Sequence, residues 1–423
     1  MLAADNRVRR YQLVLGIVFA VASVAYLAVI HQMGIESEAM KVYFPYADEL
    51  MRGSIPEMEY PPFALVFIAI PRLFASTPFG YNVAFVAEVF VFFLIGLAAM
   101  SRLAKRYNQS QSKIMVIYTV SMLLMLEFVL DRYDIFPAVL TLLSFYCLVT
   151  KNYVWAFALL SVATMTKLYP AVLFPLYLIP FFMNRDWSNV LKGITVFVAV
   201  ATAIMLPMLL LNPDAAFHFL GYHMDRPLQI ESTLSPFIYL ASMMGFTDVQ
   251  IAFGYGSDNL LGPWPDAVAP YLTPFMLAAV VAMYALYAYA LFGLRRDRRD
   301  NENNRVALLS GAMVLLLMTF ILAGKVFSTQ YIIWLIPFVV FMLMTLPDRS
   351  SKNTVMVLSV LAIILTQLNF AVNVGISGGG EAITSAGVMI ILARNIVMVI
   401  LFAQIFRIVY RDVLSRKRCV QDP

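Results

Sequence analysis

The chain has 423 residues, of which 61% are apolar and 13% charged, and its mean hydropathy is +0.80. Soluble domains carry about 25% charged residues, so this composition excludes a soluble globular protein. The apolar runs are long and unbroken rather than short and alternating, which excludes a transmembrane β-barrel and indicates membrane-spanning α-helices. The net charge of +5 is explained by short basic loops that orient such helices, so no nucleic-acid partner is predicted.

Twelve apolar runs approach the thickness of a bilayer core at about 1.5 Å per helical residue. In chain order they are residues 11–30, 80–101, 114–130, 134–150, 153–169, 170–183, 189–211, 271–294, 306–324, 331–346, 353–373 and 385–408. A further run, residues 62–75, is short and contains Pro71 and Arg72, which favours an interfacial helix over a span. We therefore predict an all-α polytopic membrane protein with about twelve transmembrane helices.

The charged residues predict the orientation of these helices. If residues 62–75 do not span and the N-terminus is inside, most of the 30 Lys and Arg residues fall on the cytoplasmic side and most Asp and Glu residues fall outside, as the positive-inside rule requires. Both termini are then cytoplasmic, including a basic tail at 409–423. We expect residues 1–423 to form a single integral domain of the cell (plasma) membrane.

Two long non-cytoplasmic loops, residues 31–79 and 212–270, place the expected functional surface outside. They are the first and fourth outer loops, and each is expected to contain an interfacial helix, the second one roofing a cavity. The chain contains no Walker motif, no glycine-rich nucleotide loop and no typical spacing of zinc ligands. ATP-driven transport and metalloproteolysis therefore have no support.

The first outer loop carries candidate general bases. Glu36, Glu38 and Glu59 lie near the water–lipid boundary, where a carboxylate can meet a lipid-borne substrate and a soluble hydroxyl together. A solvated acidic loop is the alternative interpretation of each of them.

Four basic residues outside the membrane lie beside span ends: Arg132, Lys167, Arg226 and Lys325. Each has a local explanation, such as helix capping next to Asp131 and Asp134 or a lysine reaching the headgroups. Together they suggest convergence on one anionic group, because Arg and Lys are the usual ligands of phosphate. Further polar residues lie near Arg226 and Lys325 in the sequence. They are His218, His223, Gln229 and Glu231 around Arg226, and Gln330 and Tyr331 after Lys325.

Two charges fall inside predicted spans, Glu88 and Arg394. Both are expected at similar depth below the outer surface, so we predict a structural ion pair between their helices.

These clusters resemble a known family. The matching elements are Val42-Tyr43, Tyr46-Ala47, Leu50-x-x-Gly53, Tyr60-Pro61-Pro62, Arg132-x-Asp134 with Pro137, Lys167-x-x-Pro170, the run Arg226 to Ser232, and Ser328-x-Gln330-Tyr331 with Trp334 and Pro337. They are similar to glycosyltransferase family 87, the polyprenyl-phosphate-mannose-dependent enzymes of the GT-C type, which include mycobacterial and related mannosyltransferases.

The resemblance implies a GT-C fold and an inverting enzyme that moves a sugar from a polyprenyl phosphate to a glycolipid or glycan hydroxyl outside the cell. The catalytic base of the family is usually an aspartate about four residues before the residue matched by Tyr43, but position 39 is Ala39 here. Glu38 is the nearest acid and the first choice, followed by Glu36 and then Glu59.

The resemblance also implies roles for the remaining residues. Arg132, Lys167, Arg226 and Lys325 become candidate phosphate ligands, and His218 and His223 become contacts of the sugar or phosphate. Asp134 or Asp131 orients the base region or binds the acceptor, and Gln229, Glu231, Gln330 and Tyr331 contribute to donor binding. The reaction is expected to need no metal and no cofactor, since the lipid-phosphate sugar is a co-substrate.

Two other functions remain open from sequence. Twelve spans with both termini inside is also a common layout of secondary transporters, although those place coupling acids near the bilayer midplane. A ligase or polymerase of lipid-linked glycans would share the donor chemistry and differ in its acceptor.

Overall fold

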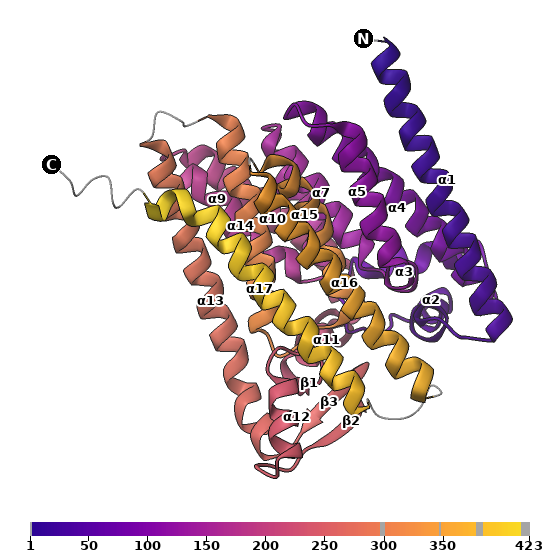
Figure 1. The fold of residues 1–423 in the computed structure, drawn as a ribbon. Helices are drawn as coiled ribbons and strands as arrows, with labels where there is room; N and C mark the ends of the chain where they lie inside the picture. The colour runs from indigo at the N-terminus through magenta and orange to yellow at the C-terminus, as the bar shows by residue number, and fades with distance from the viewer. Residues whose placement is uncertain (1, 297–300, 347, 378–383, 416–423) are drawn as a thin grey trace. The chain divides into compact units, whose positions relative to one another are not determined.

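The structure is a computed structural model that describes residues 2–296, 301–346, 348–377 and 384–415. It is mainly helical, with one small sheet (Figure 1). The chain divides into two compact units, Met1–Met224 with Ile333–Met344, and Asp225–Ile332 with Thr345–Pro423. Of the predicted cytoplasmic tail, residues 416–423 lie outside the described residues.

Among its described residues, the first unit contains only helical elements. The last two of them extend by one residue at their ends into the second unit. In chain order they are α1 (Leu2–Met33), the π-helical turn η1 (Ala39–Tyr43), α2 (Phe44–Met51), α3 (Ala64–Arg72), α4 (Pro78–Arg106), α5 (Gln111–Leu124), α6 (Leu126–Asp131), α7 (Ile135–Val149), α8 (Tyr153–Thr166), the 3-10 turn η2 (Tyr169–Val172), α9 (Leu173–Met183), α10 (Trp187–Leu211), α11 (Pro213–Asp225) and α15 (Ile332–Thr345).

Local sequence explains where several of these helices begin. Thr77 caps α4 by accepting a hydrogen bond from the Gly80 amide, and Pro78 occupies the first turn, where a missing N–H does no harm. Ser110 caps α5 and Asp186 caps α10 in the same way. α4 packs against α5 and α7, and α8 packs against α7 and α10, so α7 is buried along most of its length.

The second unit combines long helices with a small antiparallel sheet. Its elements are β1 (Leu228–Gln229), α12 (Ser235–Met243), β2 (Gln250–Gly254), β3 (Ser257–Leu261), α13 (Pro263–Arg295), α14 (Glu302–Ala323), the 3-10 turn η3 (Thr329–Tyr331), α16 (Arg349–Ser377) and α17 (Ser385–Ser415). α16 and α17 lie side by side (Figure 1), and α17 also packs against α14.

The sheet of the second unit was not predicted from the sequence. Its strand order is β1-β3-β2, with Leu228 opposite Leu260 and Ala252 opposite Asn259. A two-residue turn joins β2 to β3, and both of its residues, Tyr255 and Gly256, have positive φ, as tight hairpins require. The fourth outer loop is therefore partly a sheet rather than helix and coil alone.

Among the residues that the structure describes, seven helices are long and apolar enough to cross a membrane: α1, α4, α10, α13, α14, α16 and α17. Five shorter apolar segments coincide with the other five predicted spans: Gln111–Leu124, Ile135–Val149, Tyr153–Thr166, Tyr169–Met183 and Thr329–Thr345. A polytopic helical membrane protein is thus confirmed, whereas the number of twelve spans stays a prediction.

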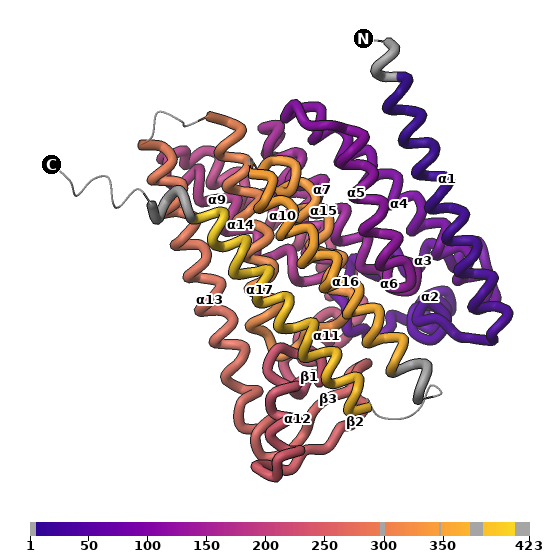
Figure 2. The backbone as a smooth tube through the Cα atoms, viewed as in Figure 1, coloured from indigo at the N-terminus to yellow at the C-terminus, as the bar shows by residue number. Residues whose placement is uncertain are grey.

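One of the two long outer loops contains a helix of the expected kind, and in the other the start of a helix differs from the expected one. α3 has nine residues, about 14 Å of helix, so it is too short to span, as residues 62–75 were predicted to be. α13 begins at Pro263, well before the expected residue 271, and continues unbroken along the tube in Figure 2. The reason is that Pro263 occupies the first helical turn, where proline is tolerated, so the polar start of the helix belongs to the outer loop.

Candidate active site

Glu38 lies at the start of the first outer loop, directly before the π-helical turn η1. Its backbone N–H donates to Oδ1 of Asp131 over 2.7 Å, and its carboxylate forms an ion pair with the guanidinium of Arg132. Arg132 lies at the end of α6 in extended conformation, with its Nε 3.6 Å from Oδ2 of Asp131. The first loop and the end of α6 therefore bring one arginine between two carboxylates.

The surroundings of Glu38 make its carboxylate more basic than that of an exposed glutamate. Burial raises the pKa of Glu38, the charge of Arg132 opposes this rise, and the charges of Asp131 and Glu59 add to it. Its side chain remains 22% exposed, so an incoming hydroxyl can reach it. A partly buried carboxylate with a raised pKa is the kind of group that removes a proton from a hydroxyl.

A second ion pair lies deeper in the first unit. Asp134 is 1% exposed, and its Oδ1 accepts hydrogen bonds from Nζ of Lys167 over 2.7 Å and from Nε1 of Trp334 over 2.6 Å. Lys167 is brought there because α8 ends at Thr166 and the next residue is extended. Trp334 is fixed in turn by Tyr169, whose ring stacks on it at 4.0 Å.

Aromatic rings surround the ammonium group of Lys167. Its Nζ lies 4.8 Å from the ring centre of Tyr133, 5.3 Å from that of Trp334 and 6.0 Å from that of Tyr60. Burial lowers the pKa of Lys167, the nearby charge of Asp134 opposes this, and the charge of Arg132 also lowers it. The lysine is thus a fixed cation within electrostatic reach of Arg132, and its first partner is a carboxylate.

The other two candidate bases lie in different surroundings. Oε2 of Glu59 accepts a hydrogen bond of 2.6 Å from the hydroxyl of Tyr46, and the charge of Glu59 acts on Glu38. Glu36 is exposed. Of the three, only Glu38 pairs with Arg132 among the described residues, and its role as the base stays a prediction.

The two histidines of the second long loop lie on α11, on the surface of the first unit. Nδ1 of His218 lies 3.5 Å from Oε2 of Glu57, and both side chains are exposed. The ring of His223 lies 5.6 Å from that of Tyr222. The structure therefore connects His218 with the first outer loop.

In the second unit, Gln229 acts as a clamp between two segments. Its amide nitrogen donates to Oε2 of Glu231 over 3.0 Å and to Oγ of Ser328 over 3.2 Å, while its Oε1 accepts from the backbone N–H of Phe327 over 2.9 Å. Its own backbone N–H donates to the carbonyl of Lys325 over 3.1 Å. Gln229 thus positions the segment that carries Lys325.

Glu231 binds the helices α16 and α17. Its Oε1 accepts from the side-chain amide of Asn369 over 3.2 Å, and it lies 3.5 Å from the guanidinium of Arg394. Arg394 is fully buried and lies over the ring of Phe327, 4.1 Å from its centre. The predicted partner of Arg394 was Glu88. That prediction is wrong, because the carboxylate that the outer loop supplies to Arg394 is Glu231.

Arg226 and Lys325 form the second pair of cations. Arg226 is 7% exposed and donates to Oγ of Ser257 over 2.7 Å. Burial lowers the pKa of Lys325, the charge of Arg226 lowers it further, and the charge of Asp225 opposes both effects, so Lys325 is within electrostatic reach of a cation and of a carboxylate.

The two remaining candidates lie in the turn η3. Oε1 of Gln330 accepts from the hydroxyl of Thr329 over 3.4 Å, and the backbone N–H of Tyr331 donates to the carbonyl of Ser328 over 3.0 Å. Both residues therefore follow directly on the segment that Gln229 holds.

The predicted phosphate ligands fall into two pairs. Arg132 and Lys167 interact within the first unit, and Arg226 and Lys325 within the second. Sequence reasoning singled out Tyr60 and Trp334 only as elements of the family resemblance, and it did not foresee that these two rings and that of Tyr133 lie around Lys167. Aromatic residues beside charged ones at span ends were the available signal, but their partners are far away in sequence. The role of each cation as a phosphate ligand stays a prediction.

Among the described residues, no group of three or more His, Cys, Asp or Glu side chains is arranged to hold a metal ion. The absence of a metal or cofactor from the reaction stays a prediction.

Comparison with known proteins gives one finding and one negative result. Residues 59–321 match the model of glycosyltransferase family 87. No curated protein matches the chain. The matched range is more than half of the chain and contains Asp134, Lys167 and Arg226, whereas Glu38 precedes it.

Proposed function

The chain belongs to glycosyltransferase family 87, and on this premise we propose that it transfers a hexose, mannose first among the candidates, from a polyprenyl phosphate to a hydroxyl of a lipid or glycan. The transfer takes place with inversion on the non-cytoplasmic side. A membrane glycosyltransferase follows from the family together with the apolar helices. The donor, sugar, acceptor and side of the membrane are the proposal.

The observation that carries the proposal is the ion pair between Glu38 and Arg132. In this pair a carboxylate whose pKa is raised lies directly beside a cation. The acceptor hydroxyl gives its proton to Glu38 while its oxygen attacks C1 of the sugar. The bond from C1 to the phosphate oxygen breaks, and its electron pair stays with the phosphate.

The leaving group explains why cations rather than a general acid surround the site. A phosphate diester becomes a monoester dianion as the bond breaks, so the charge that develops is stabilised by fixed cations. Arg132 and Lys167 are the candidates in the first unit, with Arg226 and Lys325 in the second. Asp134 holds Lys167 in place, which keeps that cation oriented before the donor arrives.

The test is transfer by the purified protein in lipid nanodiscs. Radiolabelled polyprenyl-phosphate mannose is supplied with a panel of lipid and glycan acceptors, and polyprenyl-phosphate glucose serves as competing donor. Glu38→Gln is expected to lower kcat by roughly 10²–10⁴-fold, the range for loss of a general base, while Glu302→Gln on α14 keeps full activity.

Two results would overturn the proposal. One is the absence of transfer to every acceptor. The other is full activity in Glu38→Gln, Glu36→Gln and Glu59→Gln alike. The acceptor that reacts also separates a glycolipid mannosyltransferase from a ligase or polymerase of lipid-linked glycans.

A further inference from the structure

The turn η1, which follows Glu38, has a rare backbone geometry. It is π-helical: the backbone N–H of Phe44 donates to the carbonyl of Ala39, five residues earlier. Single π-helical turns lie frequently at functional sites. Ala39 and Tyr43 are fully buried, whereas the carboxylate of Glu38 stays partly exposed. The turn is therefore packed on its inner side and presents the proposed base at its start.

Ser37, the residue before Glu38, connects this turn to a membrane helix. It is 5% exposed, and its hydroxyl donates to Oδ1 of Asn82 over 3.0 Å. Asn82 is fully buried near the start of α4. Oγ of Ser37 also accepts from the backbone N–H of Met40 over 3.3 Å, and its carbonyl accepts from the N–H groups of Met40 and Lys41, each over 3.0 Å. Ser37 therefore closes the start of the turn and fastens it to α4.

Two further hydrogen bonds fix the turn to other elements. The backbone N–H of Glu38 donates to Oδ1 of Asp131, at the end of α6, over 2.7 Å. At the far end of the turn, the hydroxyl of Tyr43 accepts from the backbone N–H of Tyr133 over 3.4 Å. The backbone of Glu38 is thus held directly by Asp131, with an attachment before it and another after it.

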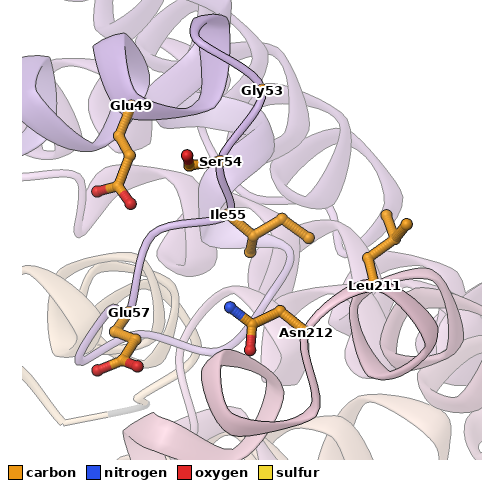
Figure 3. A pocket seen from close by; sticks show the side chains of 7 residues that line it. All are labelled: Glu49, Gly53, Ser54, Ile55, Glu57, Leu211 and Asn212. Atoms are coloured by element: carbon orange, nitrogen blue, oxygen red, sulfur yellow. The ribbon is translucent and has the colours of Figure 1, made fainter.

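An exposed stretch of the same loop has a different character. Beyond α2 the loop runs along an open pocket of about 670 Å³, where Ser54 and Ile55 lie on coil (Figure 3). Arg52, Gly53 and Ser54 are exposed there. A serine buried against a membrane helix is therefore a feature of the segment beside Glu38 and not of the loop as a whole.

Packing alone does not explain an asparagine at position 82. Nδ2 of Asn82 is buried and makes no hydrogen bond with any of the described residues. A buried donor without a partner lowers the stability of the folded state, and an apolar side chain of the same shape would avoid that cost. The contribution of this side chain therefore lies in its Oδ1, which holds Ser37.

We propose that Ser37 and Asn82 are positioning residues for the proposed base: they fix the backbone of Glu38 so that its carboxylate meets the acceptor hydroxyl in a reactive geometry. The inference rests on the proposed function, which it deepens. Displacement of a reacting group by about 1 Å can lower a rate by about 10²-fold, so a fixed backbone at this point has a large effect on the chemical step.

The main variant is Ser37→Ala combined with Asn82→Leu. It removes both partners of one hydrogen bond, a change that is nearly neutral for stability, so the Tm in nanodiscs should stay close to that of the wild type. kcat for transfer is expected to fall roughly tenfold because the base is less well placed. The KM values for donor and acceptor should stay unchanged, since neither residue touches a substrate.

Two single variants serve as controls. Ser144→Ala on α7 removes another buried hydroxyl, which donates to the carbonyl of Ala156 over 2.7 Å, and it should leave kcat unchanged. Ser37→Thr keeps the hydroxyl and should keep most of kcat. An unchanged kcat in the combined Ser37 and Asn82 variant would overturn the inference, as would an equal fall of kcat in Ser144→Ala.

A second comparison tests whether the two residues act through Glu38. Adding Ser37→Ala and Asn82→Leu to Glu38→Gln should lower the residual kcat no further, because residues that only position the base have no effect once the base is absent. A further tenfold loss in that background would overturn the inference, since the two residues would then act on the reaction by another route.

Amide hydrogen exchange of residues 38–43 measures the fastening without any transfer. Exchange should accelerate about tenfold in the combined variant, the effect of losing one hydrogen bond, and not in Ser144→Ala; unchanged exchange would overturn the inference. If the wild type glycosylates no acceptor while exchange accelerates, the proposed function fails and the fastening of the turn stands. If transfer occurs at the same kcat in both proteins, only the inference fails.

Discussion

The guanidinium of Arg394 donates a hydrogen bond of 2.7 Å to the backbone carbonyl of Glu231 and also lies 3.5 Å from its carboxylate. Asn395 donates to the carbonyls of Glu231 and Ser232 from the same turn of α17. A stretch of the long outer loop is therefore fastened to a membrane helix by a fully buried cation and its neighbouring amide.

This fastening makes Arg394 a determinant of stability. Arg394→Met leaves the carboxylate of Glu231 without its cation, and removal of one partner of a buried ion pair costs about 3–5 kcal/mol. The expected result is a clear fall in Tm of the protein in nanodiscs. Arg407→Met, an exposed position on the same helix, is the matched control. The double variant Arg394→Met with Glu231→Gln should be less destabilised than the sum of the single changes, and strict additivity would contradict the coupling.

The clamp formed by Gln229 predicts a local effect. Gln229→Leu removes three side-chain hydrogen bonds, to Glu231, Ser328 and the Phe327 amide, each worth about 1 kcal/mol. Amide hydrogen exchange of residues 325–331 should accelerate by about tenfold to a hundredfold, while exchange in α14 stays slow. Gln250→Leu, exposed on β2, should leave both segments unchanged. Unchanged exchange at 325–331 in Gln229→Leu would show that the clamp contributes nothing.

The sequence predicted the helices well because apolarity over long windows depends on local residues alone. Each predicted span coincides with an apolar helical segment, yet five of them are too short to count as spans by length. The sheet was missed for a physical reason. β1 has two residues, and the hairpin turn uses Tyr255 at positive φ, where the usual signals are Asn, Asp or Gly.

The candidate site was predictable only in part. Charged residues at span ends were visible in the sequence, and the structure does bring Glu38 to Arg132 and Asp134 to Lys167. The residues that hold them were not visible, because Trp334 reaches Asp134 across 200 positions. The partner predicted for Arg394 was wrong because the prediction compared only the depths of charged residues within helices. It overlooked that a carboxylate of an outer loop, Glu231, can reach the depth of Arg394. The match to a glycosyltransferase family, and not the pattern of charges, decides against a secondary transporter.

The two side-chain partners of Asp134 should contribute unequally to the free energy of unfolding. Trp334→Phe removes the donor to its buried carboxylate but keeps a ring to stack on Tyr169, so the expected loss is about 1.5–3 kcal/mol, the value of a hydrogen bond to a charged group. Lys167→Met leaves the carboxylate without a cation and should cost more, about 3–5 kcal/mol. Thermal unfolding of both variants measures the order, with Trp187→Phe at an exposed position as control. Adding Asp134→Asn to Lys167→Met should recover part of the loss; no recovery would contradict the assignment of the penalty to Asp134.

The final prediction concerns the pH dependence of transfer. A general base works when deprotonated, so kcat/KM should fall as the pH falls through the pKa of Glu38, which burial raises above its ordinary value of 4.5. Arg132→Gln removes the charge that opposes this rise, and the acidic limb of the profile should move to higher pH. Asp131→Asn removes a charge that adds to the rise, and the limb should move to lower pH. The pH at the midpoint of the acidic limb is measured independently of the maximum of kcat/KM. A lower kcat in Arg132→Gln therefore does not obscure the shift. Profiles of wild type, both variants and the control Arg52→Gln between pH 4 and 9 measure this, and an acidic limb at the same pH in all four would show that another group is the base.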